Sequence, residues 1–198
     1  NCFGHQVENK SKSNVNDGLL HEIGIISPNP IKALQEAFKD QNHKKAFIVM
    51  ENQGLEMSTL NEAIPEHDFV SIKDDKGLKK WIESSSKNQH LVLHDIYDYI
   101  FEVSGMEFQS MIYVSEICLK CGFQNKNSVL ITRAKASLVI ARYDGENCGL
   151  CKDASYPNLK WNKDIKKWEI EQDITLDQLP EESRKIFEKT SKLNFQIL

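Results

Sequence analysis

The sequence predicts an α/β fold built on a mostly parallel sheet with helices on both faces. Along most of the chain, short apolar runs of strand length alternate with segments in which apolar residues recur at helical spacing. The runs are apolar throughout rather than alternating, which is typical of strands covered on both faces. A chain of 198 residues with 40% hydrophobic content can also bury a substantial core.

The first strand-helix-strand unit lies within residues 22–50. Residues 22–27 form an apolar run that ends at two closely spaced prolines. Pro30 suits the first turn of a helix over residues 31–38, because its missing N–H has no partner there in any case. Residues 46–50 form the next apolar run, which completes a βαβ unit of a parallel sheet.

The same alternation predicts the remaining elements. Strands are expected at residues 69–72, 90–94, 111–114 and 138–141, with helices at residues 55–63 and 78–82. From Tyr143 onward the character changes: residues 160–172 predict a small hairpin, and Thr175 is a candidate cap for a final helix over residues 179–192. Pro180 fits only the first turn of that helix.

These elements divide the chain into three parts. Residues 1–19 are polar and rich in turn formers, and we interpret them as a connector. Residues 20–142 form the α/β lobe, and residues 143–198 form a small C-terminal appendage. The sequence does not begin with Met, so we expect it to be a piece of a longer polypeptide.

Two segments carry a resemblance to a known family. Val103-Ser104-Gly105-Met106-Glu107-Phe108 precedes a predicted strand, and Thr132-Arg133-Ala134-Lys135 precedes another. In order and spacing they resemble the last two motifs of superfamily 1 helicases, in the form found in Schlafen-type helicase-like proteins, with the second motif at the end of a helix. The resemblance implies that residues 20–142 are a second RecA-like lobe, of the P-loop NTPase type.

Arg133 is the candidate catalytic residue. A guanidinium stays charged and offers forked donors that fit a γ-phosphate, so it can stabilise charge that develops in phosphoryl transfer. The resemblance implies this role for Arg133 and places Thr132 at the nucleotide as well. The alternative is a surface arginine at a helix end, paired with an acid.

Gly105 and Glu107 are the other candidate nucleotide-binding residues. Glycine permits a tight turn near a ligand, and a carboxylate can accept a hydrogen bond from a ribose hydroxyl or hold the turn itself. The resemblance implies the ribose role for Glu107 and contact with nucleic acid for Ser104. The alternative is an ordinary loop before a strand. The chain departs from the family pattern in lacking a basic residue before Gly105 and an arginine in residues 27–29.

The sequence contains no phosphate loop of the form G-x-x-x-x-G-K-[ST] and no apolar run that ends in Asp-Glu. We therefore expect ATP with Mg²⁺ to be shared with a first RecA-like lobe, without which this chain does not hydrolyse nucleotide. The expected partners are that lobe and a nucleic acid, DNA or RNA. The alternative is a non-catalytic RecA-like binding or regulatory module.

Four of the five cysteines form two Cys-x-x-Cys pairs, Cys118/Cys121 and Cys148/Cys151, with a glycine beside each pair. This spacing approaches a four-thiolate zinc site, and each pair is expected just beyond the carboxyl end of a parallel strand. Free thiols in surface loops are the alternative. The sequence leaves the two open, so no metal ligand is assigned at this stage.

The remaining features limit the function classes. A net charge of −4 excludes a broad basic surface, and no apolar run is long enough to span a bilayer, so an intracellular protein, cytoplasmic or nuclear, is expected. His5, His90 and His94 have no ligand spacing and are expected to be structural. Trp161 and Trp168 could stack on bases, but packing is the favoured role.

Overall fold

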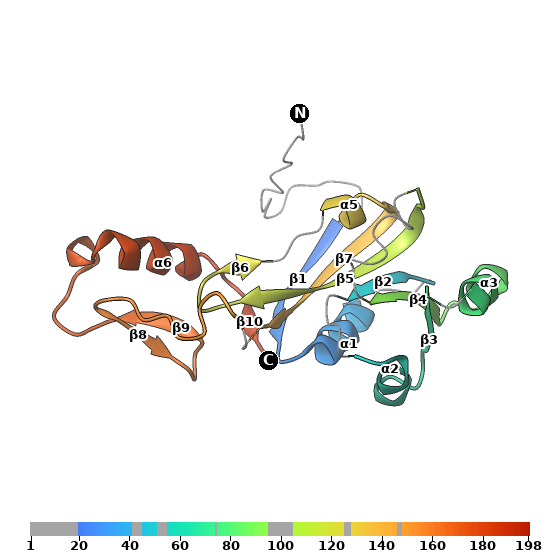
Figure 1. The fold of residues 1–198 in the computed structure, drawn as a ribbon, viewed down its shortest axis with the longest axis horizontal. Helices are drawn as coiled ribbons and strands as arrows, with labels where there is room; N and C mark the ends of the chain where they lie inside the picture. The colour runs from blue at the N-terminus through green and yellow to red at the C-terminus, as the bar shows by residue number, and fades with distance from the viewer. Residues whose placement is uncertain are drawn as a thin grey trace.

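The computed structural model describes residues 20–40, 45–50, 55–73, 75–94, 105–124, 128–145 and 148–198. The predicted connector (residues 1–19), residues 95–103, Ser104 and His5 lie outside the described residues. The described part is an α/β structure whose main sheet is mostly parallel and flanked by helices (Figure 1).

The described elements include the predicted strands and helices in the predicted order, together with three short elements that were not predicted, β6, η1 and β10. They are β1 (Leu20–Ser27), α1 (Pro30–Asp40), β2 (Phe47–Met50), α2 (Met57–Ala63), β3 (Asp68–Ser71), α3 (Asp75–Glu83), β4 (Gln89–His94), β5 (Phe108–Cys118), β6 (Phe123–Gln124), α5 (Ser128–Ile131), β7 (Ala134–Asp144), β8 (Leu159–Asn162), β9 (Lys167–Ile170), the 3₁₀ helix η1 (Leu176–Gln178), α6 (Glu181–Ser191) and β10 (Gln196–Ile197).

The main sheet has the strand order β10-β1-β7-β5-β2-β4-β3, and all neighbours in this path are parallel. The two-residue strand β6 is antiparallel to β5. β5 and β7 are both 11 residues long and lie side by side near the middle of the sheet, so the two segments that carry the resemblance belong to adjacent strands.

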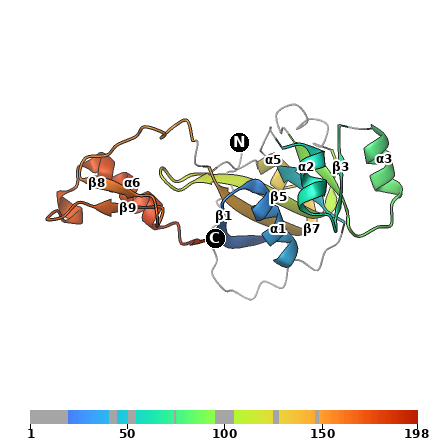
Figure 2. The same cartoon turned by 90° about the horizontal axis from the view of Figure 1, so that it is seen from below.

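Each face of the sheet has its own hydrophobic core. On one face, Ile48 and Met50 of β2 pack in a cluster that includes residues of α1 and α2. On the other, Phe47 and Val49 of the same strand pack with residues of α3 and α5. All four residues of β2 are buried. Neighbouring side chains of a strand point to opposite faces, so a strand with both faces covered is apolar at every position. In Figure 1, α1 and α2 lie below the sheet and α5 lies above it, and Figure 2 shows β8, β9 and α6 beyond one end of the sheet.

The first strand-helix-strand unit matches the prediction. Pro30 is the first residue of α1. The side-chain oxygen of Asn29 accepts a hydrogen bond from the Lys32 N–H at 2.9 Å, and the Asn29 carbonyl accepts one from the Ala33 N–H at 3.1 Å. Asn29 therefore satisfies two N–H groups of the first turn, as an N-terminal cap does.

The helix before Arg133 is shorter than the sequence predicts. α5 ends at Ile131, and Ala134 and Lys135 already belong to β7. The reason is pairing with the neighbouring strand: Ala134 lies opposite Phe108 in the parallel register, and the Phe108 N–H donates to the Arg133 carbonyl at 2.9 Å. A strand partner outside the segment therefore decides where the helix stops.

The C-terminal part contains the predicted hairpin, β8 and β9, packed against α6. α6 begins after Pro180, and the predicted capping role of Thr175 is wrong for this helix. Thr175 instead precedes η1, where its N–H donates to Oε1 of Gln178 at 2.8 Å. The chain then returns to the main sheet, because β10 pairs in parallel with β1. In Figure 1, β8, β9 and α6 lie beyond one end of the sheet.

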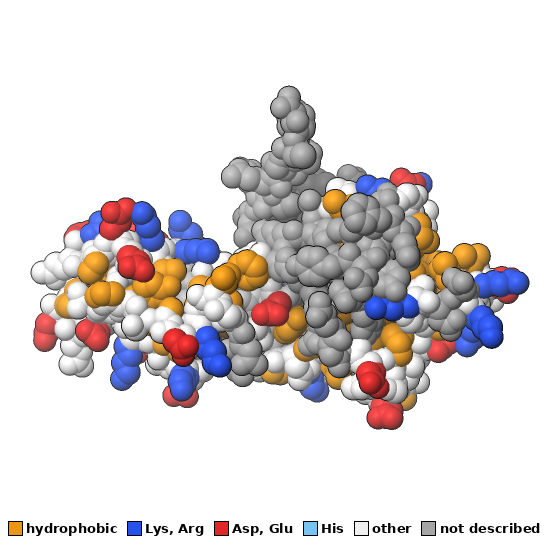
Figure 3. Space-filling model, in the orientation of Figure 1, with side chains coloured by type: hydrophobic (Ala, Val, Ile, Leu, Met, Phe, Trp, Pro, Cys, Tyr) orange, Lys and Arg blue, Asp and Glu red, His pale blue; other side chains and the backbone are white. Residues whose placement is uncertain are grey.

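Charged side chains of both signs are interspersed on the face drawn in Figure 3, including the part formed by β8, β9 and α6. This agrees with the small net charge of the sequence. Within the part of the chain that the structure describes, none of the helices has the length and apolarity that crossing a bilayer requires.

Candidate functional site

Four cysteine sulfur atoms meet at the carboxyl edge of the main sheet. β5 ends at Cys118 and the neighbouring β7 ends at Asp144, which lies opposite Ile117 in the parallel register. The loops that follow these two strands therefore start side by side. The first loop supplies Cys121 in addition to Cys118, and the second supplies Cys148 and Cys151; the four sulfur atoms all lie within 4.8 Å of one another.

The sulfur separations are near those of a four-coordinate metal site, one matching them and one shorter. A tetrahedral ion with metal–sulfur bonds of about 2.3 Å holds its sulfur ligands about 3.8 Å apart. The Sγ atoms of Cys121 and Cys148 are 3.8 Å apart, and those of Cys118 and Cys151 are 3.2 Å apart. All four cysteines are free thiols rather than disulfides in this structure. The cluster is therefore close enough to bind a metal ion.

Gly122 allows the tight turn around the first cysteine pair because its backbone is in the left-handed region. Gly122 has φ +62°, and its N–H donates to the Cys118 carbonyl at 2.8 Å, which closes the turn around the first pair. The glycine beside the second pair, Gly149, has no such role, because an added Cβ there would meet nothing within 4 Å. The second loop instead depends on Gly145, where a Cβ would overlap the side chain of Glu116.

The thiols have pKa values that differ with their surroundings. Burial raises the pKa of Cys118, and burial also raises the pKa of Cys151, to about 11. The pKa of Cys148 is lowered: burial acts to raise it, but hydrogen bonds from the Leu150 N–H and from neighbouring thiols outweigh burial. A metal ion would have to displace protons from the two high-pKa thiols, and its charge would stabilise the thiolates.

The hairpin is docked onto the first cysteine loop. The indole N–H of Trp168 in β9 donates to the Lys120 carbonyl at 2.6 Å, and Trp168 is buried. The side chain of Lys189 in α6 lies over Gly122, within 3.0 Å of the position of an added Cβ. The turn that contains Cys121 and Gly122 is therefore covered by β9 and α6 in addition to being attached to the main sheet through β5.

The two segments that carry the resemblance lie at the opposite end of the strands, where β5 and β7 begin. Glu107 directly precedes β5, and Arg133 directly precedes β7. The Phe108 N–H to Arg133 carbonyl bond joins the two segments, and Glu107 forms an ion pair with Lys135. Gly105, Glu107, Thr132 and Arg133 therefore lie where β5 and β7 begin, while the cysteines lie where these two strands end; Figure 1 shows the two strands side by side.

Arg133 is held beside the short helix α5. Its Nε donates to the Val129 carbonyl at 3.2 Å, and the Thr132 hydroxyl donates to the same carbonyl at 2.9 Å. A terminal nitrogen of Arg133 lies 3.4 Å from the Thr132 hydroxyl oxygen. The side chain is partly exposed rather than turned into the core.

Gly105 and Glu107 are less constrained than the sequence suggests. A Cβ at Gly105 would meet nothing within 4 Å, and its φ is outside the left-handed region, so the backbone there does not require glycine. The Glu107 side chain is 55% exposed in its ion pair with Lys135, so the carboxylate both holds this edge together and remains accessible.

The predicted structural role of His90 is confirmed. His90 is fully buried, and its Nδ1 accepts a hydrogen bond from the Ala46 N–H at 3.2 Å. Its Nε2 lies 2.9 Å from Nδ1 of His67, and the ring of Phe38 stacks on His67. His90 is a core residue that ties β4 to the start of β2, and the side chain of His94 lies outside the described residues.

The two tryptophans of the hairpin differ. Trp168 is buried, which confirms the packing role, and its ring meets that of Trp161 edge to face at a centroid separation of 5.3 Å. Trp161 is only partly buried and lines an open cavity beside the cysteines. Trp168 therefore has a structural role, and Trp161 is the tryptophan of the hairpin that remains accessible.

Neither a scan against protein-family models nor a search of curated proteins finds a match to this chain.

Proposed function

We propose that this chain is the second motor lobe of a superfamily 1 helicase-like NTPase, and that it supplies Arg133 to a nucleotide cleft completed by a first lobe. The observation that carries the proposal is the meeting of the two helicase-like segments at one sheet edge, where the Phe108 N–H bonds to the Arg133 carbonyl and Glu107 pairs with Lys135. The two segments are separated by some two dozen residues of sequence, so their meeting depends on the fold.

In this proposal ATP with Mg²⁺ sits between the lobes. Arg133 stabilises the charge that develops on the γ-phosphate, Glu107 accepts from the ribose, and Thr132 and Gly105 line the nucleotide side. The first lobe supplies the phosphate loop and the magnesium-binding carboxylate, which this sequence lacks. Closure of the lobes on ATP and release after hydrolysis would move a nucleic-acid strand along the edge near Gly105.

The test is ATP hydrolysis by the complete natural polypeptide that contains this chain. Its sequence should carry a phosphate loop and an Asp-Glu strand, and a polypeptide without them would remove the proposal at once. Arg133→Ala should then lower kcat on the order of 10³-fold, because a guanidinium on the transferring phosphate is worth that much. Lys79→Ala, an exposed charge removal on α3, is the matched control and should have no effect. Activity of the Arg133 variant within twofold of wild type would refute the motor role.

We further infer that the four-cysteine cluster holds a structural zinc ion. Four thiolates in tetrahedral reach are the donor set of structural zinc sites, and a closed four-cysteine site leaves no open position for chemistry. With zinc bound, Cys118, Cys121, Cys148 and Cys151 would clamp the loop after β5 to the loop after β7. The ion then acts as a staple and takes no part in nucleotide hydrolysis.

The same cluster favours a second candidate function. A zinc-stapled RecA-like module can bind a partner without turnover, and the staple lies at the edge away from Arg133, where it can support a recognition surface. The two candidates differ in one measurement. The measurement is the affinity of the complete polypeptide for its nucleic-acid or protein partner, with and without ATP. If the two affinities are equal, and Arg133→Ala leaves both unchanged, the binding module is favoured over the motor.

A further inference from the structure

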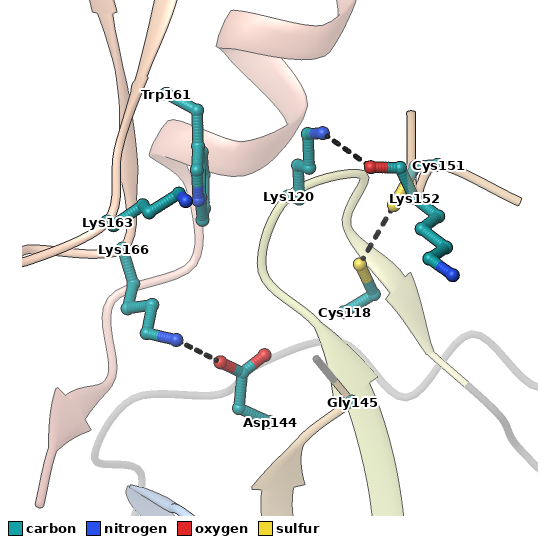
Figure 4. A pocket seen from close by; sticks show the side chains of 9 residues that line it. All are labelled: Cys118, Lys120, Asp144, Gly145, Cys151, Lys152, Trp161, Lys163 and Lys166. Carbon is teal, nitrogen blue, oxygen red and sulfur yellow. Dashed lines mark hydrogen bonds and ion pairs between the residues drawn. The ribbon is translucent and has the colours of Figure 1, made fainter. Parts of the chain in front are cut away.

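A groove separates the first and second cysteine loops from the β8–β9 hairpin. Its cavity volume is about 330 Å³, within the range of roughly 300–1,000 Å³ that is usual for ligand sites. Figure 4 shows the two walls, with Trp161, Lys163 and Lys166 on the hairpin side and the cysteine loops opposite. The lining residues are Cys118, Lys120, Asp144, Gly145, Cys151, Lys152, Trp161, Lys163 and Lys166.

The walls of the groove are held in place by named contacts. At its floor, Lys166 pairs with Asp144 at 3.2 Å, which ties the hairpin turn to the end of β7. At its upper end, the Trp168 indole is bonded to the Lys120 carbonyl, which ties the hairpin to the first cysteine loop. The groove is therefore a built feature of the fold rather than a space between independent loops.

Positive charge dominates this groove although the chain as a whole is acidic. Of the residues that the structure describes, four lysines and one aspartate line it, and Asp144 is already paired with Lys166. Lys120 donates to the Lys152 carbonyl at 3.2 Å. Among the described residues, the exposed ammonium groups of Lys152 and Lys163 contact no carboxylate. Lys163 belongs to the hairpin, and Lys152 belongs to the second cysteine loop, from which Figure 4 shows its side chain extending away from the hairpin. This arrangement suits an anion that spans the groove.

Trp161 provides an aromatic surface on the hairpin side of the groove, beside Lys163. Its ring is braced by the buried Trp168 and borders the open space on the hairpin side (Figure 4). A rigid indole near lysines matches the two needs of a single-stranded nucleic acid, a stacking surface for a base and cations for the adjacent phosphates. The groove is too small to admit a duplex.

We propose that this groove binds a short stretch of single-stranded nucleic acid, with a base on Trp161 and the adjacent phosphates on Lys152 and Lys163. An acidic peptide would use the lysines but would not need the indole, so the aromatic wall favours the nucleic acid. The site lies at the edge of the sheet opposite Arg133, and it stands whether or not the motor proposal does.

A purely structural explanation competes with this proposal. Zinc with four thiolates would carry excess negative charge, which Lys120 and Lys152 would help to offset because each is next to a cysteine. That explanation does not extend to Lys163, which belongs to the hairpin. A change of nucleic-acid affinity on removal of Lys163 therefore separates the two explanations.

The test is direct binding of the zinc-loaded chain to fluorescent ten-nucleotide oligothymidylate and oligouridylate, followed by anisotropy without ATP. Wild type should bind one or both, with affinity that falls as salt rises and with quenching of tryptophan emission. Lys152→Ala/Lys163→Ala should weaken binding at least tenfold and reduce the slope of log K against log salt by about 1.4, since each phosphate contact contributes about 0.7. Trp161→Ala should weaken binding by about 5- to 150-fold, and Trp161→Phe should restore part of it.

Two controls keep the outcomes distinct. Lys76→Ala/Lys79→Ala removes the same charge from α3 and should leave affinity unchanged. The assay contains no ATP, so failure here is separate from failure of the motor proposal. Thermal melting and zinc content confirm that each variant is folded. The proposal is overturned if neither oligonucleotide binds, if the Lys152/Lys163 variant binds like wild type, or if oligoglutamate competes as well as an oligonucleotide does.

Discussion

Arg142 Nε donates to Glu22 Oε1 at 2.6 Å, which joins β7 to β1 through side chains 120 residues apart in sequence. Arg142 is 3% exposed and Glu22 is 27% exposed. The contact lies where the register of β1 against β7 shifts, between Glu22 and Ile26. A second guanidinium nitrogen of Arg142 is buried without a partner among the described residues, so the charge depends strongly on Glu22.

Glu22→Ala should therefore destabilise the protein by about 3 kcal/mol, because removing one partner leaves a buried charge without compensation. Urea unfolding gives the free energy of unfolding directly. Glu181→Ala, which removes the acid of the fully exposed pair with Lys185, is the matched control and should have no measurable effect. Equal, small effects of the two changes would mean that water or another group replaces Glu22 beside Arg142.

The two glycines that follow a cysteine should respond differently to alanine. Gly122→Ala places a Cβ on a residue with φ +62° and within 3.0 Å of Lys189, so a loss of about 1–2 kcal/mol is expected from the backbone conformation. Gly149→Ala has neither problem and should be neutral or slightly stabilising. Thermal melting of the two zinc-loaded variants makes the comparison, and a similar shift in both would contradict the geometry assigned to the turn at Gly122.

The sequence predicted the sheet well because the strands are buried on both faces. An apolar run such as residues 46–50 can be a strand only if both sides are covered, and the two hydrophobic clusters supply that cover. Boundaries that depend on distant partners could not be predicted in the same way. The end of α5 is decided by Phe108 of β5, and the pairing of β10 with β1 joins opposite ends of the chain, which no local pattern encodes.

The sequence predicted where the candidate metal site lies but not its geometry. The spacing of the cysteine pairs and the expected strand ends placed all four at one edge, but only the structure shows that the four sulfur atoms lie close enough together to bind a metal ion. The sequence did not predict the groove between the cysteine loops and the β8–β9 hairpin. Lys152 and Lys163 come from different loops, and Trp161 differs from Trp168 only in its burial, so a sequence pattern could not separate the accessible indole from the packed one.

The proposed zinc staple gives the last prediction, which concerns the hairpin as well as the metal. Purified from zinc-containing reducing medium, the protein should hold one zinc per chain, and Cys148→Ser should lose it, because three thiolates bind a structural ion far less tightly than four. Cys2→Ser is the matched control, since Cys2 belongs to neither Cys-x-x-Cys pair. Elemental analysis of the three proteins gives the stoichiometry.

Loss of the ion should also loosen the contact between the first cysteine loop and β9. With the loop no longer clamped, the Lys120 carbonyl can leave the Trp168 indole, and tryptophan emission should shift to longer wavelength as water reaches the ring. Zinc affinity should fall as pH falls, because the raised pKa values of Cys118 and Cys151 keep these thiols protonated in competition with the metal. Wild-type protein without stoichiometric zinc, or a Cys148 variant with unchanged melting and emission, would show that the four cysteines are ordinary reduced thiols.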